Sequence, residues 1–359
     1  MLGFYSHVAM PPTPASLTID KIRTMQRKLV IHLGLPKTGT TTMQKHFFPR
    51  FVGYQGKNYQ GKRYEGWPEV SSKLIDIFYE SLSLQTLESE WKRQLSVLIK
   101  QLDFQTYPIQ VISDEHLSWR ASEGPFRSIF PPQNPVPGNT PRRTRHPITD
   151  FLITLRDFLP AEVDLLTIVT LRNQADFLGS LAAQHRILTP EAVSRVIEDQ
   201  DTFIDFFTLV TDLEKVVGAP NHLTLLFEDG VENNCEKILE FMDTSLVDSA
   251  HPFKLGAAEN VRAVSESVWK FQRPQRSYRN SMVFHAVRKL FPTRWREIMR
   301  PVSNRVAGVI DNINDLIVPR PMGFVSVSGE ERDAIRAYCG PSNALLAQHL
   351  KRDLVSLGY

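Results

Sequence analysis

The sequence predicts an α/β fold in which a central parallel sheet is flanked by helices. Four short runs are mostly apolar, and the runs 29–35 and 165–171 are typical of parallel strands buried on both faces. Longer segments with helical apolar spacing separate these runs, and strands that alternate with helices form a layered parallel sheet. The expected strands are 29–35, 109–113, 165–171 and 222–227.

The helices are predicted from the spacing of apolar residues. Within 69–102, for example, Leu74, Ile75, Phe78 and Leu82 recur three or four positions apart and would share one helix face. A proline-rich stretch, 121–147, is too long for a simple connection and is expected to be a loop that acts as a lid or substrate wall. Expected helices are 40–50, most of 69–102, 148–159, 173–187, 190–217 and much of the chain after strand 222–227.

Length and composition suffice for one large α/β domain with insertions, or for a domain with a smaller helical part. We expect residues 1–27 to be an N-terminal arm and 28–359 to be the domain, with a core at 28–245 and a helical extension at 246–359. The net charge of +3 is too small to argue for nucleic acid as a partner. Only two cysteines occur, so neither a disulfide framework nor a zinc pattern is indicated. No stretch approaches the ~20 apolar residues of a membrane span, and we expect a cytoplasmic protein.

The most informative segment is 29–42, which reads as a buried strand, a tight loop and the start of a helix. Pro36 cannot continue a central strand, and Gly39 supplies backbone freedom. Such a loop directs backbone N–H groups at one point, where the helix dipole favours an anion, and Lys37 adds a full positive charge. The segment therefore predicts a phosphate-binding loop.

The details of this loop differ from those of a kinase. Gly34 and Gly39 have the glycine spacing of G-x-x-x-x-G-K-[ST], but Lys37 precedes the second glycine and Thr40 follows it. The loop instead resembles that of sulfotransferases that use 3′-phosphoadenosine 5′-phosphosulfate (PAPS) and release 3′,5′-ADP (PAP). This resemblance implies a P-loop-NTPase-like sulfotransferase fold that requires no metal. It implies that the 5′-phosphosulfate is held by Pro36, Lys37, Thr38, Gly39, Thr40, Thr41 and Thr42.

A second segment resembles the same family. Arg172 follows strand 165–171 at its carboxyl end, where α/β sheets bind ligands, and Ser180 lies eight residues later in the expected helix. A guanidinium and a hydroxyl can share one phosphate. In the family this strand-Arg-x7-Ser pattern holds the 3′-phosphate, while Phe227 after strand 222–227 corresponds to an aromatic residue near the adenine. A helix-capping arginine and an ordinary serine are the alternative.

The string after strand 109–113 supplies candidates for a general base. Sulfuryl transfer to a hydroxyl requires a group that takes the acceptor's proton. If the strand continued, Ser113 and Glu115 would lie on one side and Asp114 on the other. The resemblance implies Glu115 as the base, with His116 second. An ion pair without a catalytic role is the alternative for Glu115.

Two other classes of function stay open. Apolar residues followed by Asp114 are also typical of the magnesium site of a nucleoside-triphosphate-dependent kinase. A non-catalytic nucleotide-binding or nucleic-acid-binding protein is the third class. The resemblance covers 29–44, 109–118, 165–186, 222–229 and 340–349.

The acceptor is the least constrained part of the prediction. Basic and aromatic residues are interleaved in 262–300, and the proline-rich loop 121–147 also carries several arginines. These residue types suit a hydroxyl of a carbohydrate, a glycolipid at a membrane surface or a small metabolite. A solvated helical face is the simpler explanation of such charge. The oligomeric state is not indicated by the sequence.

Overall fold

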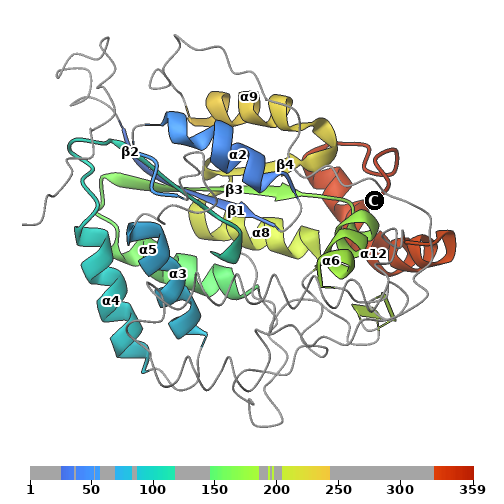
Figure 1. Ribbon diagram of the computed structural model, residues 1–359, viewed down its shortest axis with the longest axis horizontal. Helices are drawn as coiled ribbons and strands as arrows, with labels where there is room; N and C mark the ends of the chain where they lie inside the picture. Colours follow the sequence, from blue (N-terminus) through green and yellow to red (C-terminus); the bar gives the residue numbers. More distant parts are fainter. Residues whose placement is uncertain are drawn as a thin grey trace, which may run out of the picture. The chain divides into compact units, whose positions relative to one another are not determined.

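The computed structural model describes residues 26–35, 38–51, 53–56, 69–82, 87–117, 146–185, 193–194, 196–197, 204–242 and 327–359. This part of the chain has an α/β fold with a four-stranded parallel sheet in the order β2-β1-β3-β4 (Figure 1). The strands are β1 (Arg27–Gly34), β2 (Ile109–Asp114), β3 (Val163–Leu171) and β4 (His222–Leu226). The predicted fold class is confirmed.

The strand order creates a switch point beside β1. From β1 the chain moves to β2 on one side and then returns to β3 on the other. The register pairs His32 of β1 with Ser113 of β2, and Gly34 of β1 with Thr170 of β3. The carboxyl ends of all four strands therefore meet at one edge, and ligands of open α/β sheets bind outside that edge at the switch point.

Helices cover both faces of the sheet (Figure 1). One face carries α2 (Thr40–His46) and α9 (Val231–Met242). The opposite face carries α3 (Glu69–Ser81), α4 (Glu88–Lys100), α5 (Pro147–Phe158) and α8 (Phe206–Val217). Two further helices, α6 (Gln174–His185) and α12 (Gly329–Leu350), pack against each other, and α12 also packs against α8. Short 3-10 helices are η1 (Phe48–Arg50), η2 (Glu115–Leu117), η4 (Ala219–Asn221) and η5 (Phe227–Asp229).

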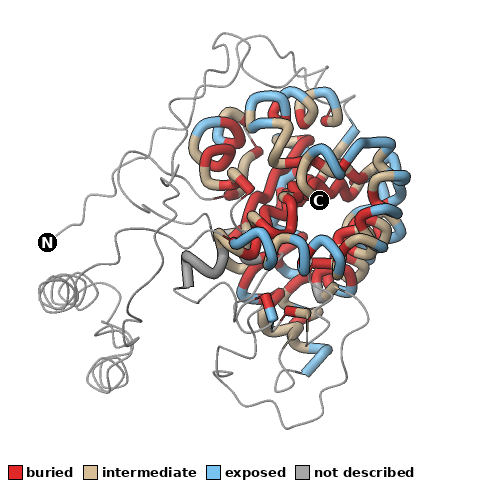
Figure 2. Tube along the Cα trace, turned by 90° about the vertical axis from the view of Figure 1, so that its right-hand side faces the viewer, coloured by how far each residue is buried: buried red, intermediate tan, exposed pale blue. Residues whose placement is uncertain are grey.

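Alternation along the strands produces two hydrophobic cores. Leu29 and Ile31 of β1 point into the core shared with α3, α5 and α8, whereas Val30 points into the core shared with α2 and α9. In Figure 2 the buried residues lie in the interior, and the outward-facing turns of the surrounding helices are exposed. Because both sheet faces are covered, nearly every strand residue is buried, which explains the continuous apolar runs in the sequence.

The predicted strands agree with the structure to within two residues at each end, and several expected helices differ for physical reasons. The expected helix 190–217 is not continuous, because Asp205 is not helical and its side chain caps the start of α8 at Phe206. The expected helix 40–50 ends at His46, and a 3-10 turn follows in which Pro49 has no N–H to donate. The helical stretch 69–102 is two helices, α3 and α4. The condition under which Ser113 and Glu115 would lie on one side is not met, because β2 ends at Asp114 and Glu115 begins η2.

Several expectations fall on residues outside the described part. These are the N-terminal arm up to 25, most of the loop 121–147, the basic segment 262–300 and all of 246–326 within the expected extension. By its contacts the chain divides into two compact units, 1–261 with 327–359 and 262–326. No helix in the described residues is long and apolar enough to span a membrane. The cytoplasmic location stays a prediction.

Candidate functional site

Four strand ends bring the predicted site residues to one edge of the sheet. The loop that ends at Gly39 follows β1, Glu115 follows β2, Arg172 follows β3 and Phe227 follows β4. The loop and Arg172 lie on the two sides of the switch point, since β1 and β3 are adjacent strands. Pro36 and Lys37 are outside the described residues.

The loop after β1 is tightly packed around two threonines. The hydroxyl of Thr38 donates to the carbonyl oxygen of Leu35 at 2.7 Å and lies 3.3 Å from the hydroxyl of Thr40. A methyl group added at Gly34 would lie 2.3 Å from Thr40 Oγ1, so only glycine lets Thr40 pack over the end of β1. Gly39 has a φ of 79°, in the left-handed region that favours glycine.

The three threonines that follow this turn differ in burial. Thr40 and Thr42 are buried, with exposed fractions of 3% and 6%, whereas Thr41 is half-buried. Thr41 is therefore the more accessible hydroxyl of the three. The helix they begin, α2, is only seven residues long, so most of the positive charge expected at this site must come from side chains rather than from a helix dipole.

The Phe227 ring lies close both to the loop after β1 and to Arg172. The Arg172 guanidinium carbon lies 4.7 Å from the centroid of the Phe227 ring. A methyl group added at Gly39 would lie 3.6 Å from Phe227 Cε2, so the same ring also borders the loop. A guanidinium over an aromatic ring is held by a cation–π interaction of about 0.5–2 kcal/mol. The structure thus brings three predicted residues from three strand ends into one cluster.

The charge around Arg172 is balanced by carboxylates. Burial lowers the pKa of the Arg172 guanidinium, and the charges of Asp176 and Glu228 act in the opposite direction. An arginine remains protonated at neutral pH after such a shift. Because one face of the Phe227 ring carries Arg172, the role of this ring near an adenine stays a prediction.

Asn173 fixes the positions of the two carboxylates beside Arg172. Its backbone N–H donates to Glu228 Oε1 at 2.8 Å, and its side-chain amide donates to Asp176 Oδ2 at 3.0 Å. The Asp176 backbone N–H donates to Asn173 Oδ1 at 2.9 Å, which caps the start of α6. Ser180 lies one turn beyond Asp176 in α6 and is half-buried. Its predicted contact with a 3′-phosphate stays a prediction.

A polar network surrounds the end of β2, where the candidate base lies. His32 Nδ1 is 2.8 Å from Ser113 Oγ, and Gln44 of α2 donates to the Ser113 carbonyl oxygen at 2.9 Å. Burial lowers the pKa of His32 to about 3, so this imidazole is neutral. Gln44 therefore connects the helix after the loop to the strand that precedes Glu115, which is half-buried in η2. The side chain of His116 is outside the described part.

Sequence reasoning missed two polar residues at this edge. Thr170 is fully buried beside Gly34, and its hydroxyl has no hydrogen-bond partner among the described residues. No sequence pattern indicates this residue, since its position depends on the register of β1 and β3. Asn173 could have been identified, because an Asn after a strand with an Asp three residues later is typical of a helix start.

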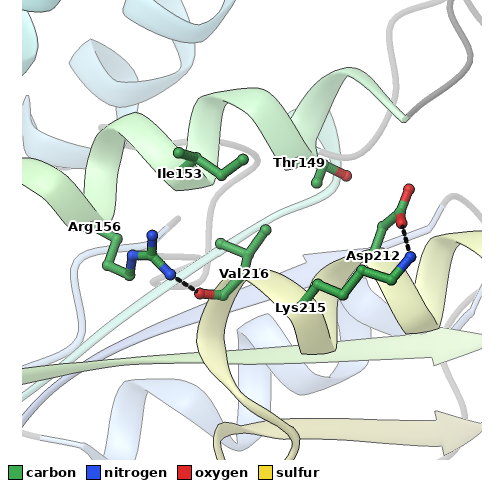
Figure 3. Close-up of a pocket in the computed structure, with 6 residues that line it drawn as sticks. All are labelled: Thr149, Ile153, Arg156, Asp212, Lys215 and Val216. Atoms are coloured by element: carbon green, nitrogen blue, oxygen red, sulfur yellow. Dashed lines mark hydrogen bonds and ion pairs between the residues drawn. The ribbon is translucent and has the colours of Figure 1, made fainter.

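A small pocket of about 150 Å³ lies elsewhere, between α5 and α8 (Figure 3). Asp212 pairs with Lys215 at 2.8 Å on one side, and the Arg156 guanidinium donates to the Val216 carbonyl oxygen on the other. Thr149 and Ile153 complete the lining. No predicted site residue lines this pocket. Among the described residues no group of three or more His, Cys, Asp and Glu side chains could hold a metal ion.

The fold of this chain is similar to that of a protein of known structure. No family model and no curated protein matches the chain. A solved structure that it resembles is a sulfotransferase from Alicyclobacillus acidocaldarius, at 12% sequence identity and a TM-score of 0.43. The alignment covers 93% of this chain and 100% of that chain. At this level the likeness assigns neither an activity nor a residue role to this chain.

Proposed function

We propose that this chain is a sulfotransferase of the P-loop-like fold that transfers a sulfuryl group from PAPS to an acceptor hydroxyl. One observation carries the proposal: the Phe227 ring borders both Gly39 of the loop after β1 and the guanidinium of Arg172 after β3. Two elements suited to phosphate therefore lie next to the same aromatic ring, on the two sides of the switch point. A nucleoside 3′,5′-bisphosphate carries two phosphates on one ribose and matches that arrangement.

The surroundings of the loop suit a bound phosphate. Gly34 lets Thr40 pack over the end of β1, Gly39 adopts the left-handed turn before α2, and Thr41 offers a half-buried hydroxyl. The hydroxyl of Thr170, buried beside Gly34 and lacking a partner among the described residues, is a further donor at this edge. Lys37, named from the sequence, would supply the positive charge. Arg172 with Ser180 would select a 3′-phosphate, which ATP lacks.

The residues then act by position and charge. PAPS supplies a sulfuryl group bonded to a phosphate that becomes the leaving group. Glu115 accepts the proton of the acceptor hydroxyl while the acceptor oxygen forms its bond to sulfur. As the bond from sulfur to the bridging phosphate oxygen breaks, Lys37 stabilises the charge that develops on that oxygen. The products are a sulfate ester and PAP. The proton of the acceptor hydroxyl is then on the carboxyl group of Glu115, or on His116 if that residue is the base.

The proposed acceptor is a hydroxyl of a carbohydrate, a glycolipid or a small metabolite. This part of the proposal rests on the residue types in 262–300 and 121–147. The kinase alternative assigns Asp114 to a magnesium ion and predicts that ATP replaces PAPS. The two functions differ in donor and in metal requirement, and one assay separates them.

The test measures release of PAP from PAPS with a panel of hydroxyl acceptors in the presence of a chelator. We expect acceptor-dependent PAP release that persists without divalent metal. Glu115→Gln should lower turnover about 100-fold or more, because general base catalysis contributes about 10²–10⁴-fold. Glu90→Gln is the matched control, since Glu90 is a surface carboxylate paired with Arg93 on α4. Phosphoryl transfer from ATP with magnesium, and none from PAPS, would contradict the proposal.

A further inference from the structure

The carboxylates beside Arg172 are both held by the C-terminal part of the chain. Arg332 of α12 pairs with Asp176 Oδ1 at 2.7 Å. The hydroxyl of Tyr359 donates to Glu228 Oε2 at 3.1 Å. These contacts join residues 156 and 131 positions apart, so they exist only because α12 and the segment after it fold back onto the edge of the sheet.

We propose that Arg332 and Tyr359 are positioning residues of the nucleotide site, which act on Arg172 through Asp176 and Glu228. The inference rests on the proposed function, because Arg172 must bind the 3′-phosphate for its position to affect affinity. It adds a role for residues that no motif of the sequence indicates.

The chain of contacts from Tyr359 to Arg172 is short, and it starts from a buried side chain and passes through half-buried ones. Tyr359 has an exposed fraction of 6%. Glu228 accepts from Tyr359 through one oxygen and from the backbone N–H of Asn173, the residue next to Arg172, through the other. Phe227, the residue before Glu228, carries the Arg172 guanidinium on its ring. Two contacts therefore link the segments after β3 and β4, one from Asn173 to Glu228 and one from Arg172 to Phe227. Tyr359 holds the Glu228 side chain that makes the first of them.

The connection through Arg332 leads to Arg172 by way of Asp176. Asp176 receives the Asn173 side-chain amide on one oxygen and Arg332 on the other. Its pKa is held below the usual range by these hydrogen bonds and by the charges of Arg332 and Arg172, although burial opposes the shift. Asp176 therefore remains a carboxylate that attracts Arg172.

Fixing Arg172 matters because an arginine side chain has many rotamers. A guanidinium that is already oriented binds an anion without the loss of entropy that ordering would require. Two fixed carboxylates and an aromatic ring restrict Arg172 before the nucleotide arrives. Loss of a contact that fixes one of these carboxylates should therefore weaken only the binding of the 3′-phosphate by Arg172.

The structure also supplies a clean way to remove the Tyr359 contact. Arg352 binds Asp229 through two hydrogen bonds of 2.6 and 3.1 Å, which anchor the same C-terminal segment independently. Tyr359→Phe therefore removes one hydroxyl while the segment keeps its second attachment. Arg332→Gln removes the charge of the other contact and keeps a side chain of similar length.

The experiment compares calorimetric dissociation constants for PAP and AMP, which differ only by the 3′-phosphate. We expect Tyr359→Phe and Arg332→Gln each to lower the preference for PAP about threefold to tenfold, as for loss of one hydrogen bond, with AMP binding unchanged. In an Arg172→Ala background neither substitution should lower the preference further, because both act through Arg172. Arg93→Gln is the matched control, since it removes another arginine–carboxylate pair of 2.7 Å, the one with Glu90 on α4.

Each outcome has one meaning. A wild-type protein without preference for PAP over AMP would overturn the proposed function and this inference together. A clear wild-type preference that Tyr359→Phe and Arg332→Gln leave unchanged would overturn the inference alone. Equal weakening of PAP and AMP, or a further loss in the Arg172→Ala background, would also overturn it, since the residues would then support the fold rather than Arg172.

Discussion

Arg172→Ala tests the assignment of the 3′-phosphate most sharply among single substitutions. The substitution removes a guanidinium that lies 4.7 Å from the Phe227 ring centroid and leaves β3, which ends at Leu171, intact. A hydrogen bond to a charged group contributes about 1.5–3 kcal/mol. Since 1.4 kcal/mol corresponds to about tenfold, one lost contact to the 3′-phosphate should weaken PAP binding about 10-fold to 150-fold.

The comparison with AMP makes this prediction specific. AMP lacks the 3′-phosphate, so its affinity should change by less than about threefold, within the range of a neutral surface substitution. The PAP affinity of Arg172→Lys should lie between those of the wild type and of Arg172→Ala, because an ammonium group keeps the charge and loses the planar fork of a guanidinium. The assay is calorimetric titration at fixed ionic strength, with thermal unfolding as the check on folding. An unchanged ratio of the AMP and PAP dissociation constants in Arg172→Ala would refute the reasoning.

Three further predictions follow from the described residues. Gly34→Ala places a methyl group 2.3 Å from a threonine hydroxyl, so it should destabilise the fold by about 1–3 kcal/mol in thermal unfolding and weaken PAP binding, whereas Gly340→Ala, with open space around it, should do neither. Burial raises the pKa of the Cys235 and Cys339 thiols to about 12, so a thiol reagent at neutral pH should modify them only in denaturant; rapid modification of the native protein would contradict this. His32 has its pKa lowered from 6.5 to about 3, so the stabilisation from its neutral form is complete above about pH 6.5 and is lost as the pH falls. Burial lowers the pKa of His222 to about 3 and that of His146 to about 4, so these histidines also contribute to the loss. Between about pH 7 and about pH 5, the loss of unfolding free energy in urea should be about 2 kcal/mol smaller in His32→Asn than in the wild type, and an equal loss in both proteins would contradict the assignment.

The sheet could be predicted from the sequence because its strands are buried on both faces. A run such as Leu165 to Leu171 has to be apolar at almost every position in a sheet that helices cover on both sides. The ends of elements were harder to predict. Pro49 ends α2 soon after it begins, and Glu115 begins a 3-10 helix where neither glycine nor proline marks the end of the strand.

The candidate site was predictable where a residue follows directly from a strand end. Arg172 and Phe227 each come after an apolar run, and such positions meet at one edge of a parallel sheet. Their contact with each other depends on β3 and β4 being neighbours, which the sequence does not reveal. The bond from Tyr359 to Glu228 spans 131 positions and has no local pattern, so only the folded chain could indicate it.

Calorimetric binding of PAP to the wild-type protein, beside ATP and with and without magnesium, tests the central claim most directly. We expect PAP to bind tightly without metal and ATP to bind at least about tenfold more weakly, because ATP offers no 3′-phosphate to Arg172. ATP binding that depends on magnesium, with no preference for PAP, would contradict the claim and favour the kinase alternative.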